Sequence, residues 1–370
     1  MFKLNKAIAV AAAIPMATLV VVGLTAGPAS ADPAPPTGAV YCGSGSDTTQ
    51  DVMQKLSEII VSSSGKKFES WNARGTSPIT TNCAAGSFAR PDGSGAGITA
   101  LRDSLNLGGE GTGPVPANAL TFARSSRGPN DTSNTDLTFI PFGIDAVAPA
   151  VKSGGGLDQK YPSGLTIAQL QDIYKCVTKT ITVGSTTYTI APYVPQANSG
   201  TRSFWLTAVG ITEADVNKAP ASGGCVRDTK ISDGSALQEH DGTVLTDPTV
   251  GTTLYTEIIP ISIAQNIAQT NHVTTGVTDR RGSSKLLSLA SQAPIVSGQI
   301  NASWPSAYQR SVYNVFKTTS VTGLTADPAL KEIFVSNSAL VCTGTPKSTI
   351  NLFGFLTNAN CGDTSVKGKK

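Results

Sequence analysis

Apolar residues recur at helical spacing in three segments, and each segment follows a turn rich in glycine, serine or threonine. The first segment carries its apolar residues on one face of an expected helix, at Val52, Met53, Leu56, Ile59 and Ile60. The second has its stripe at Ile98, Leu101 and Leu105, and the third is the run "SFWLTAV". The pattern predicts three helices that open from the turns "GSGSDTT" (43–49), "GSGAG" (93–97) and "NSGTR" (198–202).

The remaining pattern alternates between strands and helices. Residues that are β-branched or aromatic predict strands at 137–151 and in "TTYTIAPYVPQ" (186–196). Periodic apolar residues predict helices in "GLTIAQLQDIYKC" (164–176), with Thr166 as cap, "SIAQNIAQT" (262–270), "PSAYQRSVYNVFKTT" (305–319), with Pro305 in its first turn, and "PALKEIFVS" (328–336). This alternation is typical of an α/β chain, and the chain's length favours two lobes.

The N-terminus has the pattern of a secretory signal peptide. Lys3 and Lys6 precede a long apolar run that closes on Ala29-Ser30-Ala31, a small-x-small cleavage pattern. We expect cleavage after Ala31 and a secreted or cell-envelope location, with an uncleaved N-terminal anchor as the alternative. Residues 1–31 hold two of the 28 basic residues and none of the 25 acidic ones, so the mature chain has 26 against 25 and a net charge of +1. That near-neutrality argues against a nucleic-acid partner.

All six cysteines follow the signal peptide, and an even number in an oxidising compartment predicts three disulfides. Six cysteines allow fifteen pairings. We expect neighbours in the sequence to pair: Cys42 with Cys83, Cys176 with Cys225, and Cys342 with Cys361. A metal site is not expected, because no pair has C-x-x-C spacing and the chain has only two histidines, His240 and His272. Both histidines stand in polar, loop-like contexts, and each is expected to be a surface or loop residue.

Three glycine-serine turns at helix N-termini point to an anion site. A helix N-terminus exposes unpaired backbone N–H groups, and serine and threonine add hydroxyl donors without adding charge. Arg124 and Arg127 in "FARSSRGP" and Arg202 in the third turn add cations. The alternative for each single turn is an ordinary helix cap, and Asp47 with Gln50 fits a variant of the capping box.

Catalysis has less support in the sequence. No G-x-S-x-G elbow is present, two histidines leave little choice for a Ser, His and Asp set, and no turn fits the G-x-x-x-x-G-K-[ST] nucleotide pattern. A secreted hydrolase therefore remains as an alternative class, and we expect a binding protein without a cofactor.

In their order and spacing the turns resemble those of the phosphate-binding proteins that serve phosphate ABC transporters. The matching segments are "GSGSDTT", "GSGAG", "ARSSR" (123–127), "NSGTR" and the apolar crossover "PFGIDAVAPAV" (141–151). The resemblance implies an α/β, two-lobed type II periplasmic-binding-protein fold with the ligand cleft between lobes. We expect one lobe from 38–142 plus 260–370 and the other from 143–259. It further implies a monomer that captures inorganic phosphate for an ABC permease.

By position, the family's ligand-contacting residues correspond to Ser94, Ser199, Gly200 and Thr201, and the resemblance implies that these contact the ligand. Three departures from the family pattern follow. Asp47 stands where the family often has threonine, with Thr48 after it. The loop in which many members have a proton-accepting aspartate holds Ser125, Ser126 and Arg127. Pro195-Gln196 occupies the place of a common ion-pairing arginine, which leaves Arg202 as the expected cation.

These departures lead to one hypothesis and several competing functions. Asp47 would accept the ligand proton that the missing aspartate would have taken, or else it only caps its helix. The competing functions are a binding protein for sulfate, molybdate or a phosphorylated metabolite, a secreted hydrolase, and a wall-associated protein that has kept the fold without the ligand.

Overall fold

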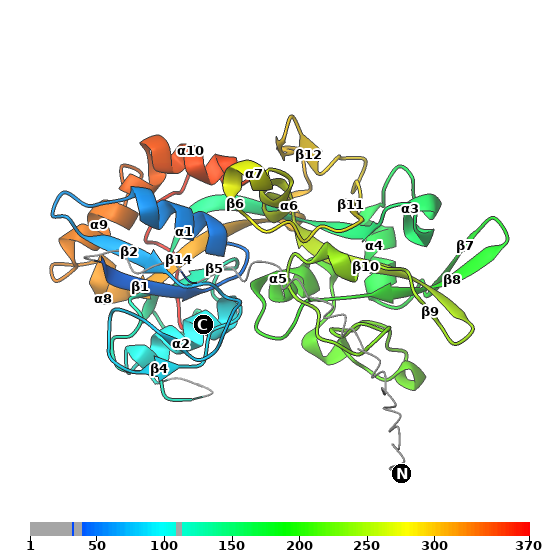
Figure 1. Ribbon diagram of the computed structural model, residues 1–370, viewed down its shortest axis with the longest axis horizontal. Helices are drawn as coiled ribbons and strands as arrows, with labels where there is room; N and C mark the ends of the chain where they lie inside the picture. The colour runs from blue at the N-terminus through cyan, green and yellow to red at the C-terminus, as the bar shows by residue number, and fades with distance from the viewer. Residues whose placement is uncertain (1–31, 33–38, 109–112) are drawn as a thin grey trace, which may run out of the picture.

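The computed structural model describes residues 32, 39–108 and 113–370, and the predicted signal peptide lies outside them. Figure 1 shows two lobes side by side, joined by long strands that run from one lobe into the other. The largest sheet has twelve strands in the order β2-β1-β5-β14-β6-β10-β8-β7, with four short strands beside this path. The chain is therefore a mixed α/β protein with two lobes, as the sequence predicts.

The first lobe forms around parallel strands. Its strands are β1 (Ala39–Gly45), β2 (Lys67–Ser70), β5 (Phe122–Ser125), β14 (Gln309–Lys317), β15 (Leu356–Thr357), β16 (Lys367–Gly368) and the hairpin β3 (Ile79–Thr80) with β4 (Ser87–Phe88). Its helices are α1 (Gln50–Ile59), α2 (Ser94–Ser104), α8 (Thr318–Val321), α9 (Pro328–Phe334) and α10 (Gly344–Leu352). β1 pairs in parallel with β2 and β5, so the turn after β1 opens at the sheet edge that faces the second lobe.

The second lobe holds the other half of the sheet. Its strands are β7 (Thr180–Val183), β8 (Thr186–Pro192), β9 (Thr249–Val250), β10 (Thr253–Ser262) and β11 (Ser284–Leu286), and its helices are α3 (Gly156–Lys160), α4 (Ile167–Tyr174) and α5 (Gly200–Val209). α6 (Ile263–Thr270), α7 (His272–Thr275) and the hairpin β12 (Ile295–Val296) with β13 (Gln299–Ile300) follow β10. Short 3-10 turns lie at Glu213–Asp215, Pro220–Ser222, Gly242–Val244, Ser306–Tyr308 and Leu340–Cys342.

One strand, β6 (Leu137–Lys152), connects the lobes. Its first part pairs with β14 and its last part pairs with β10 and β11, both antiparallel. Fourteen of its sixteen residues are buried, which is why the sequence shows an apolar run without alternation. The lobes are thus joined by continuous strand backbone.

Most predicted elements are confirmed, and one is wrong. The three helices after the glycine-serine turns are α1, α2 and α5, and Thr166 caps α4 through a complete capping box. The segment 305–319, expected to be a helix, contains the 3-10 turn Ser306–Tyr308 and then strand β14. Arg310, Val312 and Asn314 are buried while Ser311 and Tyr313 between them are partly exposed, so one face of β14 points inward; the strand itself pairs with β5 on one side and β6 on the other.

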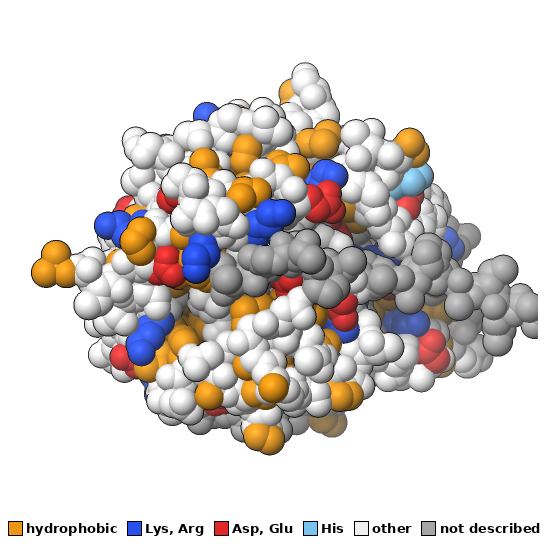
Figure 2. All heavy atoms as spheres, turned by 60° about the vertical axis from the view of Figure 1, so that its left-hand side comes forward, with side chains coloured by type: hydrophobic (Ala, Val, Ile, Leu, Met, Phe, Trp, Pro, Cys, Tyr) orange, Lys and Arg blue, Asp and Glu red, His pale blue; other side chains and the backbone are white. Residues whose placement is uncertain are grey.

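The expected pairing of neighbouring cysteines is confirmed. Disulfides join Cys42 to Cys83, Cys176 to Cys225, and Cys342 to Cys361, with Cα–Cα separations of 6.0, 5.7 and 5.8 Å. On the face seen in Figure 2, basic and acidic side chains are interspersed. Among the described residues, no helix has the length and apolarity needed to cross a membrane.

Candidate anion-binding site

The N-termini of α2 and α5 meet at the junction of the lobes. The Gly95 N–H donates to the Asn198 carbonyl across this junction at 3.0 Å. A Cβ atom added to Gly200 would overlap with the hydroxyls of Ser94 and Ser126, so only glycine fits there. The second and third turns, more than 100 residues apart in sequence, therefore lie in contact.

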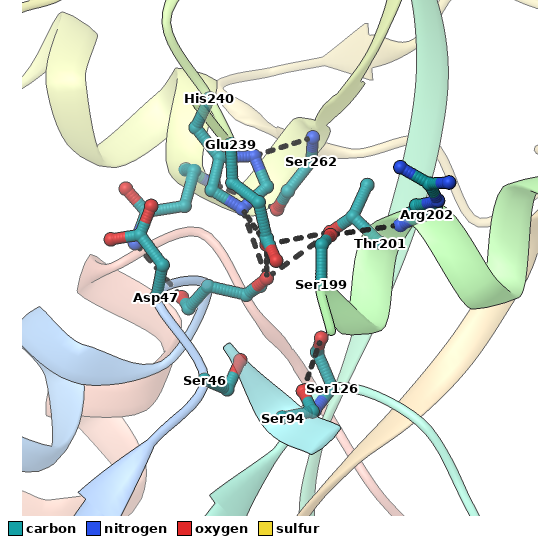
Figure 3. A network of polar contacts seen from close by, with 12 residues as sticks. Ser46, Asp47, Ser94, Ser126, Ser199, Thr201, Arg202, Glu239, His240 and Ser262 are labelled. Carbon is teal, nitrogen blue, oxygen red and sulfur yellow. Dashed lines mark hydrogen bonds and ion pairs between the residues drawn. The ribbon is translucent and has the colours of Figure 1, made fainter. Parts of the chain in front are cut away.

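Serine hydroxyls fasten the two helix ends. The Ser126 N–H donates to Ser94 Oγ at 3.0 Å, and the two hydroxyls lie 3.3 Å apart. Ser199 is the N-cap of α5 and accepts a bond from the Arg202 N–H at 2.9 Å. Ser125 instead bonds within its own loop, where its hydroxyl donates to the Arg127 carbonyl at 2.7 Å. Ser94, Ser126 and Ser199 thus lie together, as Figure 3 shows, and Ser125 shapes the loop that presents Ser126.

The first turn brings Thr48 to the same place. Thr48 Oγ1 is fully buried and lies 2.9 Å from His240 Nε2, 3.1 Å from Glu239 Oε2 and 3.4 Å from Thr201 Oγ1. These three partners belong to the second lobe, so Thr48 bridges the junction. We call the group of Thr48, Ser94, Ser126, Ser199, Gly200, Thr201, Glu239, His240 and Arg310 the cradle.

Glu239 is a cradle residue that the sequence analysis missed. Its carboxylate is fully buried, and Oε2 accepts from the hydroxyls of Thr201 at 2.9 Å and Thr48 at 3.1 Å. Burial raises the pKa of Glu239, but the hydrogen bond from His240, the Ser199 hydroxyl and the charge of Arg310 outweigh it and lower the pKa below its ordinary value. The carboxylate is therefore ionised at neutral pH.

His240 lies in a loop, as expected, but its side chain is buried, whereas His272 is exposed. The buried His240 ring has polar partners on both nitrogens. Its Nδ1 accepts the Ser262 N–H at 3.2 Å, and its Nε2 faces Thr48 and Glu239 (Figure 3). Since Nδ1 is an acceptor, the neutral ring carries its proton on Nε2. His240 therefore donates toward the cradle and is not placed to remove a proton from Thr48.

Arg310 is the cation of the cradle and was also missed. It lies on β14 with 3% of its side chain exposed, and its Nε and Nη2 donate to Asp145 Oδ2 at 3.0 and 2.8 Å. Nη2 also donates to Thr201 Oγ1 at 2.9 Å, and the guanidinium stands 5.3 Å from the centre of the Phe204 ring. Nη1 is buried without a hydrogen-bond partner among the described residues, so it has capacity for an anion.

The expected cation, Arg202, does not face the cradle. Its guanidinium pairs with Glu213 at 2.6 Å and Asp228 at 2.8 Å, and in Figure 3 it points away from the other labelled side chains. Two carboxylates therefore already balance its charge. Arg124 is fully buried and donates to the carbonyls of Gly45, Ser46 and Trp71, which fixes the first turn from behind.

Arg127 is buried beside the cradle, and burial lowers its pKa to about 10. Its Nη1 donates to the Gly128 carbonyl at 2.9 Å. Arg127 directly follows the cradle residue Ser126 in the sequence. Among the described residues, its guanidinium makes no hydrogen bond to a cradle residue.

Asp47 does not cap its helix. The N-cap of α1 is Thr49, and it makes no side-chain capping bond. Instead the fully buried Asp47 carboxylate pairs with Arg74 at 2.6 Å and lies 4.0 Å from Arg280. Two arginines therefore lie against the Asp47 carboxylate, an arrangement that the expected capping box with Gln50 did not predict.

A cavity of about 640 Å³ lies next to Asp47, between α1 and the segment that follows α6. Arg74 and Arg280, the two partners of Asp47, line it together with Asp51 and the exposed residues around Val273. The cavity brings solvent to the arginines on one side while Asp47 itself stays buried on the other.

Asp92 adds a second acid at the junction. It accepts a bond from the Gln196 side chain at 3.2 Å, across the two lobes. Burial, and then the negative charges of Asp47 and Glu239, raise the pKa of Asp92 to about 6, against the lowering effects of Arg74 and Gln196. This contact therefore depends on pH in the range below neutrality.

Comparison with solved structures shows the fold. The chain is similar to a putative phosphate ABC transporter substrate-binding protein with bound phosphate from Clostridium perfringens, with a TM-score of 0.51 and 13% identity over 87% of this chain and 100% of that chain. This chain has the fold of that protein. An ABC-type phosphate transport receptor from Vibrio cholerae gives a TM-score of 0.49 and 17% identity, over 86% of this chain and 100% of that one. No family model and no curated protein matches the sequence.

Proposed function

We propose that this chain is a secreted solute-binding protein that captures inorganic phosphate between its lobes for uptake by an ABC-type importer. One observation carries the proposal: the N-termini of α2 and α5 meet where the hydroxyls of Ser94, Ser126 and Thr201 converge with Arg310. Backbone N–H groups at helix ends, neutral hydroxyls and one guanidinium are the donors that suit a small oxyanion. The solved structure with the same fold contains bound phosphate, which supports this choice of ligand.

A buried carboxylate favours phosphate over sulfate. Sulfate carries no proton at neutral pH, whereas hydrogen phosphate can donate one to a carboxylate acceptor. Both Asp47 oxygens are buried and, although paired with Arg74, make no hydrogen bond to a described residue. We propose that Asp47 accepts the ligand proton in place of the family's loop aspartate, which is missing from the loop of Ser125, Ser126 and Arg127.

Calorimetric titration with phosphate, sulfate and molybdate tests the function. We expect heat from phosphate, and heat from sulfate or molybdate alone would overturn the choice of ligand. Thr201→Val removes a cradle hydroxyl at nearly constant volume. It should weaken phosphate binding about tenfold, which corresponds to a loss of about 1.4 kcal/mol of binding free energy. Thr207→Val is the matched control, because Thr207 lies on the exposed face of the same helix.

The hydrolase alternative depends on His240, since His272 is exposed on α7. A base for Thr48 would need a free electron pair on Nε2, and the Ser262 N–H at Nδ1 favours the opposite tautomer. Turnover of a chromogenic phosphate ester that disappears in His240→Gln would support the hydrolase. A lack of binding to every anion tested would support a wall-associated protein without a ligand.

The location and the importer are tested in cells. We expect the mature protein in the extracytoplasmic fraction, starting at Asp32, and detection only in the cytoplasm would contradict the uptake role. Loss of phosphate uptake at low external phosphate after deletion of the gene would support delivery to an importer.

A further inference from the structure

Glu239 places a carboxylate where the cradle's donors converge. Its Oε2 lies 3.1 Å from Thr48 Oγ1, 2.9 Å from Thr201 Oγ1 and 3.1 Å from His240 Nε2. We propose that Glu239 is an internal ligand of the cradle, which occupies donors of the oxyanion site until the oxyanion displaces it and so sets the binding affinity. This inference rests on the proposed function and names the residue that competes with its ligand.

The carboxylate spans the junction as a bound anion would. Thr48 belongs to the turn after β1 in the first lobe, whereas Thr201 and His240 belong to the second lobe. The three donors surround one oxygen of Glu239, and Figure 3 shows Thr201 and His240 beside its carboxylate. The internal carboxylate therefore stabilises the contact between the lobes in the absence of an external anion.

The fit of this internal ligand is incomplete. Glu239 Oε1 is buried without a hydrogen-bond partner among the described residues, and the same holds for Arg310 Nη1 and Ser46 Oγ. A carboxylate has two oxygens, whereas a tetrahedral oxyanion has four and can meet donors in more directions. Unsatisfied buried polar atoms are costly, so a ligand that satisfies them gains over the carboxylate that does not.

Two charges of the same sign cannot share the cradle at low cost. A carboxylate that remained on Thr48 and Thr201 would both repel a phosphate there and hold its donors. The backbone around Glu239 is held, because Arg74 donates to the Glu239 carbonyl and Gln269 donates to the His240 carbonyl at 3.0 Å. Displacement is therefore a rotation of the Glu239 side chain about its own torsions, with the loop in place.

The test is calorimetric titration of phosphate and sulfate into the wild-type protein, Glu239→Gln and Glu239→Ala. We expect both variants to bind phosphate at least tenfold more tightly than wild type, because the competing charge is gone, and sulfate binding to rise as well. Glu332→Gln is the control, since it removes one acidic group on α9 that bonds only to Ser63 near the surface. Its affinity should equal that of wild type.

The outcomes separate this inference from the proposed function. If the wild type binds phosphate and both variants bind it equally or more weakly, the inference is overturned and the proposed function stands. If the variants lose phosphate binding and bind sulfate more tightly, the inference is overturned and Glu239 is the proton acceptor. If neither the wild type nor the variants bind either anion, both the inference and the proposed function are overturned. If the variants do not fold, a crystal structure of the wild type with phosphate decides, because Glu239 Oε2 must then have left Thr48 and Thr201.

Discussion

Replacing Arg310 by methionine should remove several kcal/mol of stability. Methionine keeps an unbranched apolar stem but is shorter, and it removes the guanidinium that stands over Phe204 and pairs with Asp145 at 2.8 Å, in a site where both side chains are at most 3% exposed. Asp145 would keep only the Ser262 hydroxyl and the Ala264 N–H as donors. Breaking a buried ion pair in this way costs about 3–5 kcal/mol, because it leaves an uncompensated buried charge.

Urea unfolding, followed by tryptophan fluorescence without added anion, measures this cost. Lys285→Met is the control, because Lys285 pairs with Asp158 at a similar 2.7 Å but is 45% exposed, and such pairs contribute about 0–1 kcal/mol. Adding Asp145→Asn to Arg310→Met should recover part of the loss, since no charge is then left unpaired. A loss for Arg310→Met no larger than that of Lys285→Met would refute the reasoning.

Three further predictions concern the junction and the covalent frame. Asp92→Asn should abolish a pH dependence of the wild-type free energy of unfolding, measured by urea titration at each pH. The raised pKa of Asp92 stabilises the folded protein by up to about 3 kcal/mol, an effect that is complete below about pH 4 and is lost as the pH rises through about 6. Asp47→Asn should lower the ratio of phosphate to sulfate affinity in calorimetry, and an unchanged ratio would remove Asp47 from ligand recognition. Cys176→Ser with Cys225→Ser should lower the unfolding free energy by about 3–4 kcal/mol, since this disulfide closes a loop of 49 residues; a change under about 1 kcal/mol would contradict the loop-closure estimate.

Much of the fold follows from local pattern. Apolar residues at helical spacing gave α1, α2 and α5, and the uninterrupted apolar run gave β6 because a strand buried on both faces needs no polar side. The exception was β14. Its apolar residues match helical spacing over a short stretch. Its buried face carries Arg310 and Asn314 beside Val312, so no alternation of apolar and polar residues marks the strand in the sequence.

The turns of the candidate site were predictable from local chemistry. Ser94, Ser199, Gly200 and Thr201 belong to turns that open helices, and such turns can be read from a few neighbouring residues. Glu239 and His240 belong to a loop without periodicity, and only the tertiary structure brings them to Thr48, 191 and 192 residues away.

The charged side chains of the site were harder still to assign. An arginine in a turn looks available in the sequence, but its partners come from elsewhere: Glu213 and Asp228 neutralise Arg202, while Arg74 and Arg280 hold Asp47. Electrostatic roles therefore depend on long-range neighbours, which the residue types alone do not specify.

All six cysteines lie in the described part of the chain, and each disulfide closes a loop inside one lobe. Disulfide formation therefore stabilises each lobe internally and adds no covalent link across the junction of the lobes. Within the described residues, noncovalent contacts and the continuous backbone of β6 hold the two lobes together. Reduction of the disulfides should accordingly destabilise each lobe internally and leave the contacts between the lobes unchanged.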